Sequence, residues 1–507
     1  MEQEGLLLGI DIGTSACKAA VFEPDGRVAA QASEPYPVYH PQPGWAEQAP
    51  EDWWQAVCRA LAALAQKGVS LKAIRGIGVD GQSWSAIPIG AGGQVLCRTP
   101  IWTDTRAADC CRALEARCGA ARLFAVSGNP VQPMYTMPKV LWYKQNDPGV
   151  YGSAVKILQS NSFIAFRLIG VPTQDPSQGY GWNCYDMRRG CWDAALCQEA
   201  GVDPALLPEI VPSQQVIGAV TGQAAGGTGL PVGVPVVAGG LDAACGTLGA
   251  GVCRPGQTQE QGGQAGGMSI CMDAPHADPR LILGAHVVPG RWLLQGGTVA
   301  GGAALNWFER EFGAQERQDS ARDGVSSFAE LSLAAGRIPP GSEGLVFLPY
   351  LAGERSPIWD VHARGVFYGV DFAKTRAHFA RAVMEGVAYA LRHNLETAEQ
   401  SGAAVGALRA MGGAANSTVW TQIKADVTGK TLEVPASDTA TALGAALLAG
   451  VGIGWYADCA QAAENTVRVR RRHTPNPANR AAYEAGYQTY RSLYENLKQQ
   501  MKKEQAS

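Results

Sequence analysis

The feature that most constrains this chain is its first apolar stretch, residues 6–21, which reads LLLGIDIGTSACKAAV. Apolar residues lead into Asp11, a tight turn follows at 13–15, and a second apolar strand returns. A buried strand that ends in an acid beside such a turn offers backbone N–H groups and hydroxyls to a phosphate, and the acid can hold the accompanying Mg²⁺. An ordinary β-hairpin explains the same stretch. A second acid in an equivalent setting, Asp242, favours the phosphate site.

The length and the net charge describe a globular chain without a strong excess of either charge. At 507 residues it is too long for one core, so two domains are expected. The net charge is −3, and the closest approach to a basic run, residues 468–472, is typical of a solvated face. Nucleic acid and membrane are therefore not expected as partners, and no stretch of about 18 apolar residues is present.

The cysteines and the N-terminus indicate a compartment. Thirteen cysteines are scattered without CxxC pairs or histidines at metal-ligand spacing, which indicates reduced thiols. The first residues, MEQEG, lack the basic region of a signal peptide. We therefore expect a cytoplasmic protein.

The chain repeats one pattern at the scale of a domain. A strand, a glycine-rich turn and a strand open each half, at 6–21 and again at 258–272, and each half then alternates strands with helices. This pattern predicts two similar α/β domains that face each other across a central cleft. The expected boundaries are 1–252, 253–455 and a helical tail over 456–507.

Four local expectations accompany this organisation. A small hairpin is predicted over 86–97, around the glycine turn at 90–93. The polar and aromatic loop at 171–193 is predicted to form a lid over a site. The strand at 234–240 is expected to deliver Asp242, and the helix at 439–449 to belong to the second domain.

Taken together, several motifs in order along the chain resemble the FGGY carbohydrate kinases, which have the actin-like, ribonuclease H-like ATPase fold, and the xylulokinase branch most of all. These motifs are GIDIGTS (9–15), WAEQAPEDWW (45–54), GVDGQSW (78–84), WTDTRA (102–107), VVAGGLDAACGTLGAG (236–251), LPYLAGERSP (348–357), GVFYGV (365–370), EGVAYALR (385–392) and GGAANS (412–417). The resemblance covers nearly the whole chain, and it implies an ATP-dependent kinase with ATP and Mg²⁺ bound between the two domains.

The resemblance implies that Asp242 is the general base. Phosphoryl transfer to a sugar hydroxyl needs an acceptor for the proton of that hydroxyl. A carboxylate at the end of a buried strand can serve, although a helix N-cap suits the same position.

The resemblance also implies nucleotide contacts. Asp11 corresponds to the acid that positions Mg²⁺ through water, and Lys18 adds charge or is a surface lysine. The residues that would approach the nucleotide are Gly13, Thr14, Ser15, Gly263, Gln264, Gly302, Asn306, Gly412, Gly413 and Asn416. The second turn lacks the hydroxyls usual in the family, so we expect Gln264 to donate its amide to a phosphate. Close packing of helix and strand is the alternative explanation, and for Gly302 the two explanations are equal.

On the sugar side, the resemblance implies contacts from Gln82, Ser83, Trp84 and Asp104. Xylulokinases usually carry Met-His at the positions of Ser83 and Trp84, so this pocket is unusual: an indole stacks on C–H groups but lacks the second acceptor of an imidazole. Asp104 meets hydroxyls of the substrate or pairs with Arg106, and the sequence leaves both interpretations open.

The sequence therefore predicts an ATP-dependent sugar kinase acting on a ketopentose such as xylulose. A kinase for another polyol or ketose is an alternative, as is a non-catalytic actin-fold regulator that binds nucleotide. A homodimer is an option that the sequence does not decide.

Overall fold

The opening hairpin forms as the sequence predicts and lies at the centre of a seven-stranded sheet. The computed structural model describes residues 5–437 and 439–503. Six strands form a continuous path, and a seventh pairs beside β5. In spatial order these are β13 (Val216–Ala219), β14 (Pro235–Val237), β5 (Ile74–Gly81), β1 (Leu6–Ile12), β2 (Ala16–Phe22) and β3 (Val28–Pro35), with β15 (Gly240–Leu241) on β5.

Helices cover both faces of this first sheet. One face packs against α1 (Pro50–Gln66) and α6 (Ser160–Ile169), and α8 (Gly222–Thr228) lies against these two helices. The other face packs against α9 (Asp242–Gly249) and α15 (Ala440–Gly452), with α16 (Cys459–Thr466) beside them. Apolar residues of β1 and β5 such as Leu8, Ile10 and Val79 are fully buried between these layers.

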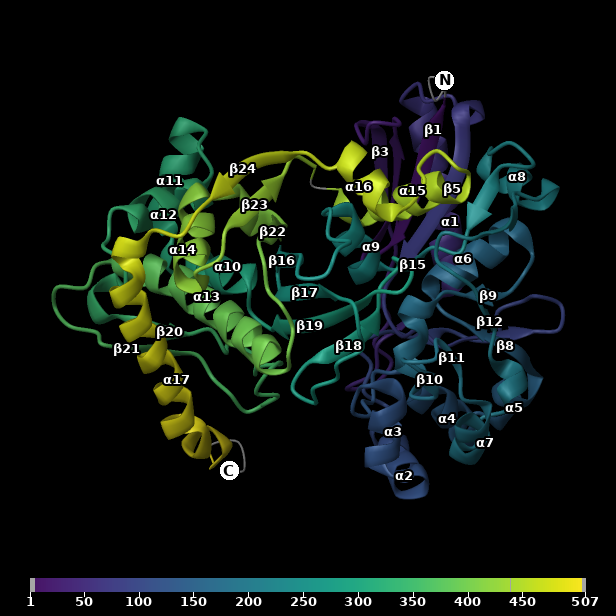
Figure 1. Ribbon diagram of the computed structural model, residues 1–507, viewed down its shortest axis with the longest axis horizontal. Coiled ribbons are helices and arrows are strands. Elements are labelled where there is room, and N and C mark those ends of the chain that lie inside the picture. Colours follow the sequence, from purple (N-terminus) through teal and green to yellow (C-terminus); the bar gives the residue numbers. More distant parts are fainter. Residues whose placement is uncertain (1–4, 438, 504–507) are drawn as a thin grey trace.

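The helix α15 reaches the first sheet although it lies near the end of the chain (Figure 1). A Cβ on Gly9 would come within 1.9 Å of the Ala442 carbonyl oxygen, and one on Gly78 within 1.9 Å of the Ala445 carbonyl oxygen. Only glycine permits this approach of helix to strand. The sequence assigned this helix to the second domain, but it packs on the first lobe.

A second seven-stranded sheet forms the other lobe. Its order is β18 (Ile282–Ala285), β19 (Trp292–Thr298), β17 (Gly266–Met272), β16 (Thr258–Gly262), β22 (Leu408–Met411), β23 (Leu432–Pro435) and β24 (Val469–His473). The helices α13 (Arg376–Gln400) and α14 (Thr418–Thr428) pack against this sheet. Around them lie α10 (Gly302–Phe312), α11 (Ala314–Asp323), α12 (Ser327–Gly336) and α17 (Arg480–Lys503), with the small pair β20 (Val346–Leu348) and β21 (Val366–Tyr368). Two α/β lobes of the predicted kind are thus present (Figure 1).

Residues 86–158 and 173–215, on either side of α6 in the chain, form a helical extension of the first lobe. It contains β6 (Ile87–Gly90), α2 (Ala108–Cys118), α3 (Ala120–Ser127), α4 (Thr136–Asn146), α5 (Pro148–Ser153), β8 (Ala154–Leu158), the 3₁₀ helix η2 (Pro176–Trp182), β10 (Tyr185–Asp186), β11 (Cys191–Trp192) and α7 (Ala194–Ala200). The hairpin predicted at 86–97 forms only in part. Its turn closes, but the return strand pairs at the single bridge Ile89–Val95, and the main partner of β6 is β8.

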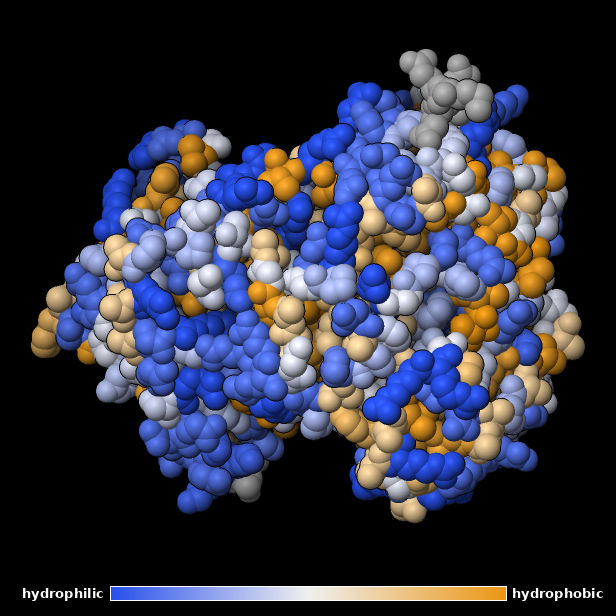
Figure 2. Space-filling view, viewed as in Figure 1, coloured by the Kyte–Doolittle hydropathy of each residue, from blue (hydrophilic) through white to orange (hydrophobic). Residues whose placement is uncertain are grey.

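The two lobes touch through β18. The side-chain amide of Asn129 donates to the Leu283 carbonyl at 2.7 Å, and its oxygen accepts from the Leu283 N–H at 3.0 Å. A notch separates the lobes on the lower side of the surface (Figure 2). In the part of the chain that the structure describes, no helix is both long and apolar enough to span a membrane.

Candidate active site

Three carboxylates meet where the central strands of the first sheet end. Asp11 and Asp80 are neighbours in the parallel register of β1 and β5, and Asp80 is also the partner of Gly240 in β15. Asp242 follows directly as the first residue of α9. Ligands of open α/β sheets bind at the carboxyl ends of parallel strands. Asp11 and Asp242 therefore share one edge of the sheet, as the sequence predicted.

Crowding and burial make these carboxyl groups weak acids. The pKa of Asp11 is raised by burial, against the opposing effect of Lys18. Burial and the neighbouring charge of Asp11 raise the pKa of Asp80 well above its usual range. Burial, and next the charge of Asp11, raise the pKa of Asp242 to about 7. A carboxyl with such a pKa is suited to accept a proton near neutral pH.

Asp80 was not selected from the sequence, although it is an acid at the end of a buried strand, like Asp11. It is fully buried, and neither carboxylate oxygen has a hydrogen-bond donor within the described residues. Such a group needs a cation or a proton. Two carboxylates completed by phosphate oxygens and water are a usual environment for Mg²⁺. No group of three His, Cys, Asp or Glu side chains in the described ranges could hold a metal ion by itself.

The first glycine turn is held from several sides. Its Gly13 N–H donates to the Ala16 carbonyl at 3.2 Å, and Gln48 donates to the Thr14 carbonyl at 2.8 Å. The indole N–H of Trp102 donates to the Thr14 hydroxyl at 2.8 Å. Ser15 is exposed at the tip. A turn fixed in this way presents its remaining polar groups without loss of order on binding.

A cavity of about 680 Å³ brings together most of the residues expected to contact the nucleotide. Its lining includes Gly263, Gln264, Gly302, Asn306, Gly413 and Asn416, and Gly412 adjoins Gly262 at its rim. The Asn306 amide donates to Gln264 Oε1 at 3.1 Å, which leaves the amide nitrogen of Gln264 free to donate elsewhere. The size is that of a small-molecule site.

Trp84 forms the floor of the expected sugar site in an unusual conformation. Its φ is 57°, a left-handed value that is strained for an aromatic residue. The buried ring packs against Tyr135 at 4.8 Å and Tyr180 at 5.7 Å between centroids, and its Nε1–H has no partner within the described residues. Tyr180 belongs to η2, so this part of the segment predicted as a lid is buried and packs against Trp84.

Lys139 holds this conformation and was not found from the sequence. It is fully buried, and its Nζ donates to the carbonyl oxygens of Trp84 at 2.8 Å and Ile101 at 2.9 Å. Burial lowers the pKa of Lys139 to about 7. Of the other expected sugar contacts, Gln82 donates to Gln48 Oε1 at 2.7 Å while its own Oε1 is buried without a partner in the described chain, and Ser83 is half-buried.

Asp104 has the geometry of a structural ion pair. Its carboxylate accepts from the Ala46 N–H at 2.7 Å and from Arg106 Nη2 at 2.8 Å, and it is fully buried. Arg106 also pairs with Glu47 at 2.8 Å and stacks on Trp45. This geometry favours the second of the two interpretations that the sequence left open.

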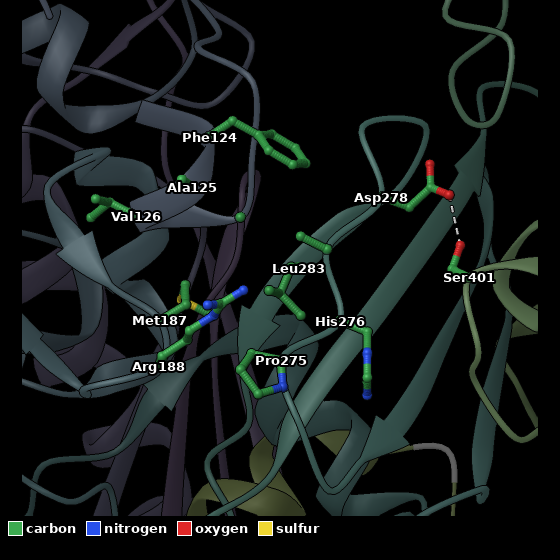
Figure 3. A pocket seen from close by; sticks show the side chains of 12 residues that line it. Phe124, Ala125, Val126, Met187, Arg188, Pro275, His276, Asp278, Leu283 and Ser401 are labelled. Carbon is green, nitrogen blue, oxygen red and sulfur yellow. Dashed lines mark hydrogen bonds between the residues drawn. The ribbon is translucent and has the colours of Figure 1, made fainter. Parts of the chain in front are cut away.

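Another cavity, of about 340 Å³, lies between the lobes away from these residues (Figure 3). It is lined from the first lobe by Phe124 and Arg188 and from the second by His276, and an Asp278–Ser401 hydrogen bond of 2.7 Å closes one side. None of the expected site residues lines it.

The family of this chain follows from comparison with known proteins. Residues 6–249 match the N-terminal domain of the FGGY family of carbohydrate kinases, and residues 274–453 match its C-terminal domain. The chain belongs to the FGGY family of carbohydrate kinases. It is therefore a phosphotransferase of the class that phosphorylates sugar hydroxyls at the expense of ATP.

Relatives of this FGGY kinase align over nearly its full length. A xylulose kinase of Bacillus subtilis (strain 168) is 32% identical over 97% of each chain. A gluconokinase of the same organism is 29% identical, over 92% of this chain and 91% of the relative. The solved xylulose kinase from Rhodospirillum rubrum superposes with a TM-score of 0.90 and 32% identity, covering 98% of this chain and 99% of that one. The predicted fold is confirmed.

Proposed function

We propose that this kinase transfers the γ-phosphoryl group of ATP to a hydroxyl of a ketopentose such as xylulose. The observation that carries the proposal is the meeting of Asp11, Asp80 and Asp242 at one sheet edge. The names of the xylulose kinase relatives supply the sugar class.

In the proposed reaction Asp242 accepts the proton of the attacking hydroxyl. The sugar oxygen forms a bond to the γ-phosphorus as the bond to the β-phosphate oxygen breaks, and the electron pair leaves with ADP. Asp11 and Asp80 would hold Mg²⁺, which when bound neutralises charge on the phosphates. The turn at Gly13, Thr14 and Ser15 orients the phosphates from the first lobe.

The second lobe would bind the rest of the nucleotide. Gly263 and Gln264 would meet the phosphates, and the cavity residues Gly302, Asn306, Gly412, Gly413 and Asn416 would surround ribose and base. Gln82, Ser83 and Trp84 would contact the sugar, with Trp84 against a C–H face.

Two further expectations, a cytoplasmic location and a homodimer, remain proposals. All the cysteines are free thiols, which suits the reducing cytoplasm. Pairing of two copies of the chain stays a prediction, which sedimentation of the purified chain would test.

The test is a coupled ADP-release assay over pentuloses, polyols, hexuloses and gluconate. We expect turnover to be stimulated most by a ketopentose. Stimulation only by another compound would refute the ketopentose, and nucleotide binding without stimulated turnover would favour the regulator. Thermal-shift measurement with the same compounds gives an independent readout, because a bound ligand stabilises the fold by mass action.

A further inference from the structure

The motif at 348–357 has no role in the mechanism above, yet it reaches across the cleft. It follows β20 in the second lobe. The Arg355 guanidinium carbon lies 5.5 Å from the ring centroid of Trp102, which belongs to the first lobe. Trp102 is the residue whose indole N–H donates to the Thr14 hydroxyl. Arg355 therefore approaches the first glycine turn from the opposite lobe.

The backbone of Arg355 is anchored beside the second glycine turn. The buried carboxylate of Glu354 accepts from the Thr298 hydroxyl, from the Val299 N–H at 2.9 Å and from the Arg355 N–H at 2.7 Å. Thr298 is the register partner of Gly266, and the nearby Gly301 N–H donates to the Gln264 carbonyl at 3.0 Å. The guanidinium thus lies between the two turns that the proposed function assigns to phosphates.

The guanidinium lacks the anion that a buried arginine usually has. Arg355 is half-buried, and desolvation lowers its pKa. Across residues 5–437 and 439–503 it forms no ion pair, whereas the buried Arg106 and Arg381 each have a carboxylate partner at 2.7–2.8 Å. The neighbouring Glu354 is already occupied by three donors. A desolvated cation without an anionic partner is unfavourable, so this position suits an anionic ligand.

We propose that the Arg355 guanidinium binds the non-bridging oxygens of the phosphoryl group during its transfer, from the lobe opposite the base. A guanidinium matches two phosphate oxygens at once and stays protonated throughout. It neutralises charge while the proton passes to Asp242, the new bond forms to the sugar oxygen, and the old bond to ADP breaks. This inference rests on the proposed function only in placing the phosphates between the two turns.

The first test separates catalysis from binding. We expect Arg355→Met to lower kcat by about 100-fold or more, the effect of losing one such charge-stabilising donor, with KM for the sugar changed less than about threefold. Arg355→Lys keeps the positive charge but loses the planar pair of N–H donors, so its kcat should lie between those of Arg355→Met and the parent. Arg322→Met removes an exposed arginine of α11 (69% exposed) and serves as the charge-matched control, with unchanged kcat.

The second test measures binding alone. Calorimetry compares ADP with ADP plus Mg²⁺ and aluminium fluoride, which imitates the planar phosphoryl group. We expect Arg355→Met to keep ADP affinity within about threefold and to weaken the fluoride complex at least 100-fold. Equal kcat in Arg355→Met and parent would overturn the proposal, as would an equal loss of affinity for both ligands.

The outcomes keep the two proposals apart. The sugar used is whichever compound stimulates the parent. A parent without any sugar-stimulated turnover refutes the proposed function, and the fluoride complex still tests Arg355. If the parent phosphorylates the sugar and the Arg355→Met variant is equally active, only the proposal about Arg355 is refuted.

Discussion

Asp242→Asn should make the chain more stable and inactive at the same time. In the folded chain the pKa of Asp242 rises from 3.8 to about 7, because of burial and then the Asp11 charge. The folded state thus holds this proton more tightly than the unfolded chain does. The ionised carboxylate therefore costs stability above pH 3.8, and that cost is complete above pH 7. Asparagine resembles the protonated acid and removes the cost.

The size of the effect follows from the same two pKa values. A tenfold change in proton affinity corresponds to about 1.4 kcal/mol, so at pH 8 the variant should gain up to about 4 kcal/mol. At pH 5 the gain in the free energy of unfolding should be about 2 kcal/mol, because pH 5 lies between the unfolded and folded pKa values of Asp242. For a domain of about 250 residues, 4 kcal/mol corresponds to a rise of about 8 °C in Tm.

The assay is thermal unfolding without divalent metal from pH 5 to pH 8, with Asp109→Asn as the control at an exposed aspartate. The same variants are assayed for turnover with Mg²⁺ and ATP. Loss of a general base costs about 10²–10⁴ in rate, and the parent kcat/KM should fall about tenfold per pH unit on the acid side of about pH 7. A variant that is no more stable than the parent at pH 8, or that matches its activity, would refute the assignment of Asp242.

Two further variants test the groups that the sequence did not reveal. Asp80→Asn should weaken Mn²⁺ binding in the presence of ADP by about tenfold, since a charged ligand is lost; calorimetry beside Asp109→Asn measures it, and unchanged affinity would exclude Asp80 as a ligand. Lys139→Met should lower the free energy of unfolding by about 2 kcal/mol or more, because two buried carbonyls lose their donor, and should raise KM for the sugar while ADP affinity stays constant. Equal changes in both constants would contradict a role of Lys139 in holding Trp84.

The elements that the sequence predicted well are those with a local signal. The hairpin over 6–21, the helix beginning at Pro50 and the alternating units after residue 408 are all present. Their periodicity and turn residues depend on neighbours within a few positions. The role expected of Asp242 beside Asp11 came from the family resemblance, because from the residues alone a helix N-cap suited Asp242 as well.

The features that the sequence did not reveal depend on distant partners. β6 pairs with β8 rather than mainly with its own return strand, and α15 packs on the lobe that its position in the chain did not suggest. Lys139 suits a helix by its local sequence, but its role comes from the hydrogen bond that it donates to the carbonyl of Trp84, 55 positions away. Nothing local distinguishes such a lysine from one on a surface.

The crowding of acids at one sheet edge connects the strength of the base with the need for a metal. The charge of Asp11 raises the energy of the Asp242 carboxylate, and the charges of Asp11 and Asp242 raise that of Asp80, so free nucleotide phosphates would add to the repulsion. A divalent cation between the acids and the phosphates would turn this repulsion into attraction. In the proposed reaction the first lobe would therefore favour the metal complex of the nucleotide over the free nucleotide. Under the proposal, further positive charge for the phosphoryl oxygens comes from the other side of the cleft, where Arg355 lies without a carboxylate partner among the described residues.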